Sequence, residues 1–218
     1  MKKLIFAALI LFMGFATNSW AITFTGTIIG GNTLIGTSPW DTNSSNLSWT
    51  VYDNSITGHW TYEYIFTVPS KDISHVIIEV SDNFSVGNII ETSSGRDPDA
   101  PKTYSPGGSN PGMPDDLFGI KWDTSGDPLI YSFYIVTDRA PMWGDFYAKN
   151  GVHQGSDVYA YNSQFGINTT ALIDNGNAGG WVLVPDTGTG IIPEPSTFLL
   201  LGTGLLGIAA IRYRRSKK

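Results

Sequence analysis

Alternating apolar and polar residues in segment 60–68 constrain the fold of this 218-residue chain more than any other feature. Apolar side chains occupy every second position: Trp60, Tyr62, Tyr64, Phe66 and Val68. The positions between them are polar, with Ile65 as the one exception. Because successive side chains of a β-strand point to opposite faces, this pattern predicts a strand with one buried face.

The same period of two recurs along the chain, and no part of segment 22–184 shows convincing helical periodicity. Further strands are predicted at 47–52, 76–80, 118–122, 129–137, 146–149, 158–161 and 181–184. The 25 glycines and 12 prolines punctuate the chain at short intervals, and no internal repeat is visible. We therefore expect an all-β fold, an antiparallel β-sandwich with a jelly-roll-like topology, whose strand order the sequence does not specify.

The first 21 residues have the features of a signal peptide. Lys2 and Lys3 form a positively charged N-terminal region, and residues 4–16 form an apolar stretch that is short for a membrane span. Ser19 and Ala21 place small residues at the two positions that a signal peptidase reads, which predicts cleavage after Ala21. The alternative is an uncleaved anchor helix.

The other end of the chain carries an uncharged apolar stretch at 197–211, which predicts a transmembrane helix flanking a C-terminal basic cluster. The cluster consists of Arg212, Arg214, Arg215, Lys217 and Lys218. Basic residues stay on the cytoplasmic side of a membrane. The domain before the helix is therefore expected on the periplasmic side of the inner membrane.

Pro193, Glu194 and Pro195 stand directly before this helix. Together with the helix and the basic tail, they resemble the PEP-CTERM sorting signal of Gram-negative bacteria. The resemblance implies recognition by exosortase, a membrane cysteine transpeptidase that removes the helix near the motif. It also implies a final location at the cell surface or in the extracellular matrix, and an association with exopolysaccharide and biofilm production.

The residues around the motif suit such processing. Two prolines break a helix and keep the chain extended, as a protease needs its substrate. The resulting domain organisation is a signal peptide at 1–21, a β-sandwich at 22–184, a flexible stalk at 185–192 and a sorting signal at 193–218. A plain C-terminal anchor behind a proline-rich stalk is the alternative.

Charge excludes several partners of the central domain. Segment 22–192 holds six basic and 18 acidic residues, a net charge of −12. A domain this acidic is repelled by phosphate backbones, so we expect no nucleic acid partner, and divalent cations or neutral polymers fit better. The chain has no cysteine, which excludes disulfides, thiolate nucleophiles and thiolate metal sites.

No catalytic motif is visible, and we expect no enzymatic activity. The three histidines, His59, His75 and His153, have no metal-binding spacing and are expected at the surface or at strand edges. A Gly-x-Ser-x-Gly elbow is absent as well. A glycosidase with two carboxylates distant in sequence stays open as an alternative.

Segment 123–127 is a candidate site for calcium, and no other cofactor is expected. Asp123 and Asp127 present hard oxygen ligands, but the EF-hand pattern is missing. Asp, Ser and Gly are equally what a hairpin turn needs, and the turn is the favoured interpretation.

Aromatic side chains near loops are weak candidates for stacking on sugar rings: Trp40, Trp122 and Trp143. Core packing is the alternative for each of them. Segment 93–114 is rich in proline and glycine, with little that could pack, and is expected to be an extended surface loop.

Similar tails also occur on proteins labelled ice-binding. Thr23, Thr25 and Thr27 share one face of a strand, but ice recognition needs such rows repeated across a flat surface, and the sequence shows only one.

The leading hypothesis is a non-enzymatic surface or matrix protein, sorted by exosortase, with exopolysaccharide as its partner through aromatic side chains or calcium. A polysaccharide-modifying hydrolase or lyase and a purely structural surface spacer are the alternatives.

Overall fold

The computed structural model describes residues 22–54, 57–93, 98–151, 157–169, 171, 173 and 179–185, and nearly all regular structure in them is β-strand. The exception is one short 3-10 helix, η1 (Val86–Asn88). These residues form no helix that is long and apolar enough to span a membrane. The predicted signal peptide and transmembrane helix lie outside them.

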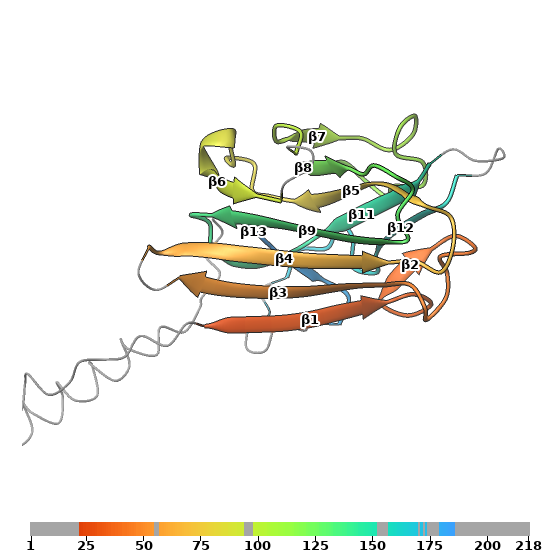
Figure 1. Cartoon of the computed structure of the whole chain (residues 1–218), viewed down its shortest axis with the longest axis horizontal. Helices are drawn as coiled ribbons and strands as arrows, with labels where there is room; N and C mark the ends of the chain where they lie inside the picture. Colours follow the sequence, from red (N-terminus) through yellow and green to blue (C-terminus); the bar gives the residue numbers. More distant parts are fainter. Residues whose placement is uncertain are drawn as a thin grey trace, which may run out of the picture. The chain divides into compact units, whose positions relative to one another are not determined.

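Five antiparallel strands form the first sheet, in the order β1-β3-β4-β9-β6. Their bounds are Thr23–Ile29 (β1), Asn46–Asn54 (β3), His59–Thr67 (β4), Ile130–Thr137 (β9) and Ile89–Thr92 (β6). The strand predicted at 60–68 is confirmed as β4, at the centre of this sheet, with Tyr62, Tyr64 and Phe66 buried. Figure 1 looks onto the sheet, with β6 at the top and β1 at the bottom.

Six antiparallel strands form the second sheet, in the order β2-β12-β11-β5-β8-β7. Their bounds are Leu34–Gly36 (β2), Tyr159–Asn162 (β12), Phe146–Asn150 (β11), Ile73–Glu79 (β5), Leu117–Asp123 (β8) and Lys102–Tyr104 (β7). A separate ribbon pairs β10 (Pro141–Gly144) with β13 (Val182–Pro185). The hydroxyl of Tyr64 donates to the carbonyl oxygen of Leu183 at 2.7 Å, which ties this ribbon to the five-stranded sheet.

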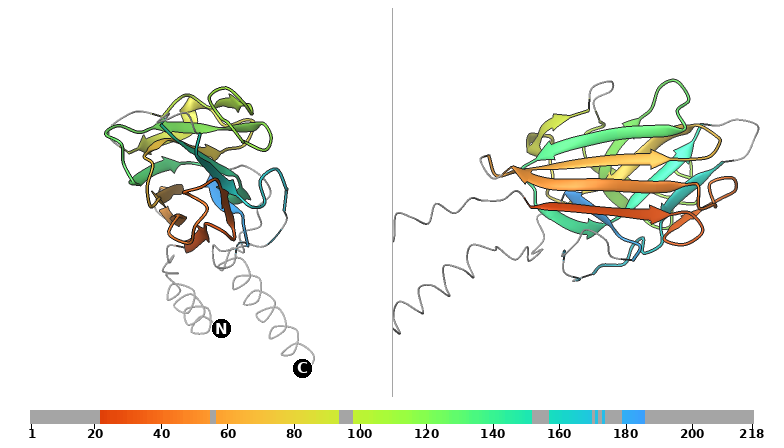
Figure 2. Two further views of the ribbon diagram at one scale, coloured as in Figure 1. Left: turned by 90° about the vertical axis from the view of Figure 1, so that its right-hand side faces the viewer. Right: turned by 60° about the horizontal axis from the view of Figure 1, so that its bottom comes forward.

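The two sheets pack against each other through large aromatic side chains. Phe66 of β4 lies 5.1 Å from Phe146 of β11, and Phe133 of β9 lies 5.1 Å from Trp122 of β8, between ring centroids. Figure 2 shows the resulting layers from two further sides. Aromatic pairs at these separations add to the free energy already gained by removing apolar area from water.

The all-β, antiparallel prediction is confirmed, and the jelly-roll-like topology stays a prediction. Six connections between consecutive strands cross from one of the two large sheets to the other, starting with β1 to β2 and ending with β8 to β9. The sequence analysis did not predict β2, β6, β7 or β10, each of which has only three or four residues. None of the four contains a run of alternating apolar and polar residues that would indicate a strand.

The prediction of an extended surface loop at 93–114 is wrong for part of this segment. It contains β7, and its Tyr104 and Met113 are buried against the outer side of the six-stranded sheet. The sheet contributes Ile77, Leu117 and Tyr147 to this second apolar cluster. Scattered apolar residues between prolines and glycines show no periodicity, so no local pattern indicates that this segment packs.

Candidate functional site

No other described element lies over the outward side of β1, β3, β4 and β9 (Figure 1), and their outward side chains are exposed or half-buried. We call this outward side the open face. Two rows run across its four strands: Thr25, Thr50, Glu63 and Tyr134 in one, and Thr27, Ser48, Ile65 and Ser132 in the next. All eight side chains are exposed or half-buried.

Threonine and serine are the commonest residues on the open face. The sequence analysis identified the threonines of β1, and the strand order places Thr50 and Ser48 beside them and Ser132 in the same row on β9. Thr61 lies one row further on, opposite Tyr52. Threonine is well suited to a strand because its branched Cβ packs on the pleated surface. The hydroxyl of Thr27 donates to the carbonyl oxygen of Leu47 at 3.2 Å and keeps its acceptor capacity for a ligand.

Two tyrosine–carboxylate pairs lie on the same side of the sheet. The hydroxyl of Tyr52 donates to Oε1 of Glu63 at 3.0 Å, and the hydroxyl of Tyr134 donates to Oε1 of Glu91 at 2.7 Å. Partial burial, followed by the hydrogen bond to Glu63, raises the pKa of Tyr52. The hydrogen bond to Glu91 is the main reason why the pKa of Tyr134 is raised. Both phenols therefore stay protonated donors, and both carboxylates keep acceptor capacity for another partner.

The charge on this surface is entirely negative. None of the five strands of the sheet contains Lys or Arg, and Glu63 and Glu91 lie on the outward side. Hydroxyls, tyrosine rings and carboxylates are the groups that bind polyhydroxylated, uncharged ligands. A polyanion would be repelled.

The outer side of the six-stranded sheet contrasts with the open face, because it carries Lys residues that form ion pairs with Asp residues. Lys121 lies 3.4 Å from Oδ2 of Asp99 and 3.2 Å from Oδ1 of Asp123, and Lys102 lies 3.1 Å from Oδ2 of Asp99. Lys149 lies 3.8 Å from Asp157.

His75 lies among these ion pairs and is only 5% exposed, which corrects the prediction of a surface or strand-edge histidine. Its Nε2 has no hydrogen-bond partner. Burial, reinforced by the positive charge of Lys121, lowers the pKa of His75 to about 4, against the opposing effect of Asp123. The imidazole is therefore neutral near pH 7.

The three tryptophans proposed as sugar platforms lie in the core, which corrects that prediction. Trp40 is 0%, Trp122 1% and Trp143 8% exposed. Their indole N–H groups are also engaged inside the domain: Trp40 donates to the Ser70 carbonyl oxygen at 2.8 Å, Trp122 to Thr92 Oγ1 at 3.3 Å and Trp143 to the Ala171 carbonyl oxygen at 3.1 Å. Their ring faces are not available to a sugar, and the alternative, core packing, is confirmed.

The segment considered for calcium connects the two sheets and is not the turn of a hairpin, because β8 and β9 belong to different sheets. Gly126 and Asp127 both have positive φ, at 77° and 53°. The carboxylate of Asp123 is paired with Lys121. Within the described part of the chain, no three His, Cys, Asp or Glu side chains gather as metal ligands, and calcium at Asp123 and Asp127 stays a prediction.

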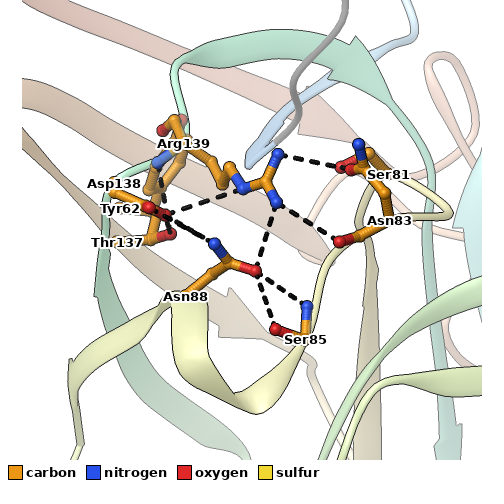
Figure 3. A network of polar contacts seen from close by, with 8 residues as sticks. All are labelled: Tyr62, Ser81, Asn83, Ser85, Asn88, Thr137, Asp138 and Arg139. Carbon is orange, nitrogen blue, oxygen red and sulfur yellow. Dashed lines mark hydrogen bonds and ion pairs between the residues drawn. The ribbon is translucent and has the colours of Figure 1, made fainter.

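A polar network around Arg139 joins the segment after β5 to the turn after β9 (Figure 3). The guanidinium donates to Asn83 Oδ1 at 3.3 Å and to Asn88 Oδ1 at 3.2 Å, and its Nε lies 3.6 Å from Asp138. Tyr62 donates to the carbonyl oxygen of Arg139 at 2.9 Å. The guanidinium N–H groups are directed at these neighbours. We therefore interpret Arg139 as a residue that links two loops and not as a ligand-binding residue.

The residues predicted to act in export and sorting lie outside the described part of the chain. They are Ala21 at the predicted cleavage site, the motif Pro193, Glu194 and Pro195, and the basic cluster of Arg212, Arg214, Arg215, Lys217 and Lys218.

Comparison with known families identifies the C-terminal part of the chain. Residues 192–215 match the family model of the PEP-CTERM protein-sorting motif, which confirms the resemblance seen in the sequence. The motif implies a protein that is exported, anchored in the membrane before processing, and sorted with exosortase as its processing partner. No curated protein and no solved structure matches the chain.

Proposed function

We propose that this exported chain is a non-enzymatic protein of the cell surface or biofilm matrix, and that its open face contacts neutral exopolysaccharide. The observation that carries the proposal is the open face itself, where rows of hydroxyls lie beside the pairs Tyr52–Glu63 and Tyr134–Glu91. The sorting motif supports the location, since it implies export to a place where such polymers occur.

The chemistry of the open face favours a neutral polymer. Sugar hydroxyls both donate and accept hydrogen bonds, and they match threonine and serine hydroxyls as well as carboxylate oxygens. Half-buried tyrosine rings offer apolar area to the C–H face of a sugar ring. An acidic polysaccharide would meet a domain whose net charge is −12 over residues 22–192, with no cation on these strands to offset it.

The hydrogen bonds of two acidic residues, Glu79 and Asp145, support the proposal that the protein is not an enzyme. Oε2 of Glu79 accepts the backbone N–H of Asp145 at 2.7 Å. The carboxylate of Asp145 accepts Asn162 Nδ2 at 2.8 Å and the backbone N–H of Gly166 at 2.7 Å. Burial raises the pKa of Asp145. These bonds join Asp145 to β5, to β12 and to the segment after β12, and we interpret both acidic residues as structural.

A binding measurement tests the polysaccharide proposal. The mature chain in detergent is titrated with neutral exopolysaccharide from the producing strain and followed by calorimetry or by co-sedimentation. Tyr134→Ala and the charge reversal Glu63→Lys are expected to weaken binding about tenfold each, in line with about 1–2 kcal/mol per contact. Tyr161→Ala is the matched control, because Tyr161 is a half-buried tyrosine on the outer side of the other sheet.

Three results would contradict the proposal. No binding by the unaltered chain would leave the structural spacer as the better hypothesis. Equal weakening by Tyr161→Ala and Tyr134→Ala would move the site away from the open face. Release of new sugar ends during incubation would favour the hydrolase or lyase.

The hydroxyl rows also favour a second candidate, binding to ice. The strand order places Thr25 beside Thr50 and Thr27 beside Ser48, so the row seen in the sequence is repeated on β3. Beyond β3 the rows are interrupted by Glu63 and Ile65. Inhibition of ice recrystallisation that is lost in Thr25→Lys would support this candidate, and the absence of inhibition would exclude it.

A further inference from the structure

Ile22, the first described residue, is held by two contacts to Asp53 at the end of β3. Its backbone N–H donates to Oδ1 of Asp53, and its carbonyl oxygen accepts the backbone N–H of Asp53 at 3.1 Å. The pair continues the ladder of β1 and β3 by one position beyond Thr23 and Tyr52. The Ile22 side chain packs against the main core, which anchors this end of the strand.

The position of Asp53 in its strand is unusual for an acid. It follows Trp49 and Val51 at alternate positions, and both of these are buried in the core. Asp53 is therefore on the core side of the sheet and is half-buried. A carboxylate there needs a partner, because removing a charge from water without one is costly. The partner in the structure is the backbone nitrogen of Ile22.

We infer that Asp53 is a docking site for the mature N-terminus of the domain. Cleavage after Ala21 adds water across the peptide bond, which leaves a carboxylate on Ala21 and an amino group on Ile22 that takes up a proton. The resulting ammonium lies at the nitrogen that already donates to Asp53. This inference rests on the predicted cleavage site and is independent of the polysaccharide proposal.

Processing thereby changes the strength of this contact without moving its atoms. In the precursor the nitrogen of Ile22 is a neutral amide, and after cleavage it is a cation facing a half-buried carboxylate. The bond in the precursor already has an ionised acceptor, and cleavage adds the Coulomb attraction between two opposite charges at the same contact. The additional stability appears only when the signal peptide has been removed, so it acts on the exported domain and not on its precursor.

A four-way comparison tests the inference on the chain ending at Lys218, purified in detergent. One form begins at Ile22 and a second carries one additional glycine, which moves the ammonium away from Asp53; each is made with Asp53 and with Asp53→Asn. In the form beginning at Ile22, the substitution is expected to raise the equilibrium constant of unfolding about tenfold, and in the extended form about threefold or less. With Asp53 intact, the glycine alone is expected to raise it severalfold.

Two further measurements complete the test. Asp82→Asn, which removes an exposed acid from the turn after β5, is the matched control and is expected to leave the difference between the two forms unchanged. Acetylation of the α-amino group, followed by mass spectrometry, is expected to be severalfold slower in the chain with Asp53 than in the Asp53→Asn variant. Equal effects of Asp53→Asn in both forms, or a native mature N-terminus other than Ile22, would overturn the inference.

Discussion

The outer sides of the two sheets differ in how they meet solvent, although both belong to antiparallel strands. The open face of the five-stranded sheet carries hydroxyls, two tyrosine–carboxylate pairs and no cation. On the other sheet, segment 102–113 buries Ile77 and Tyr147. Every residue of β11 is buried, so this strand has no solvent face.

This difference shows which side of the domain is free for a ligand. Apolar side chains on both sides of a strand need cover on both sides, and Met113 and Tyr104 provide it for β5 and β11. The outward positions of β1 and β3 are polar except for Ile29, and these strands have no such cover. A surface that stays polar and uncovered has no role in packing, which is why we place the proposed function there.

The largest loss of stability is expected where segment 102–113 packs against the six-stranded sheet. Gly112 has a φ of 67°, and a Cβ added there would lie 1.9 Å from Cζ of Tyr159. Gly112→Ala therefore combines a strained backbone with a steric overlap, and it is expected to reduce the free energy of unfolding by about 3 to 5 kcal/mol. Urea unfolding followed by tryptophan fluorescence measures this change.

Gly108→Ala is the matched control for this prediction. Gly108 also has a positive φ, 52°, but a Cβ there would meet nothing within 4 Å. Its substitution is expected to cost about 1 kcal/mol, from backbone strain alone. Equal costs at the two positions would show that segment 102–113 is not packed as tightly as the geometry indicates.

The covered side is also expected to be sensitive to acid. The pKa of buried His75 is about 4, against about 6.5 in an unfolded chain. The folded state disfavours protonation of His75, whereas the unfolded chain takes up this proton below about pH 6.5. The full free energy of unfolding is therefore present above pH 6.5, and part of it is lost as the pH falls towards 4. The loss reaches about 3 kcal/mol at pH 4. The free energy of unfolding, measured between pH 7 and pH 4, reports it.

His75→Gln and His75→Phe are the controls, since neither side chain takes up a proton in this range. Each is expected to flatten the pH dependence by the same amount relative to the unaltered chain, whatever its effect at pH 7. All other titratable groups are common to the three proteins, so the comparison removes their contribution to the pH dependence. Parallel curves for the three proteins would contradict the burial of His75.

The sequence predicted the long strands of both sheets well and their surroundings poorly. Strand β4 was found because five alternate apolar residues allow only one interpretation. The open face was missed because its rows depend on strand order: β4 pairs with β9, about 70 residues further along the chain. Glu63 was recognised as outward-facing, but no local pattern places Tyr134 beside it.

The buried tryptophans show a second property that local sequence does not predict, the burial of a loop residue. Trp40 follows a proline and precedes an acid, a setting typical of a surface loop, yet its ring lies 5.4 Å from Phe66 in the core. Burial of a loop residue is decided by tertiary packing and leaves no periodicity to read. The sorting motif needed no such information, because its recognition depends on consecutive residues.

The smallest change in stability is expected from removing one tyrosine hydroxyl on either side of the domain. Tyr147 donates from the covered side to the carbonyl oxygen of Pro111 at 2.8 Å, and Tyr134 donates from the open face to Glu91. Tyr147→Phe leaves the carbonyl of half-buried Pro111 without its donor and is expected to cost about 1 kcal/mol in the free energy of unfolding. Tyr134→Phe is expected to leave the urea midpoint unchanged, because water replaces the lost partner. Equal shifts of the two midpoints would contradict the distinction between an open and a covered side, since both hydroxyls would then contribute to folding alike.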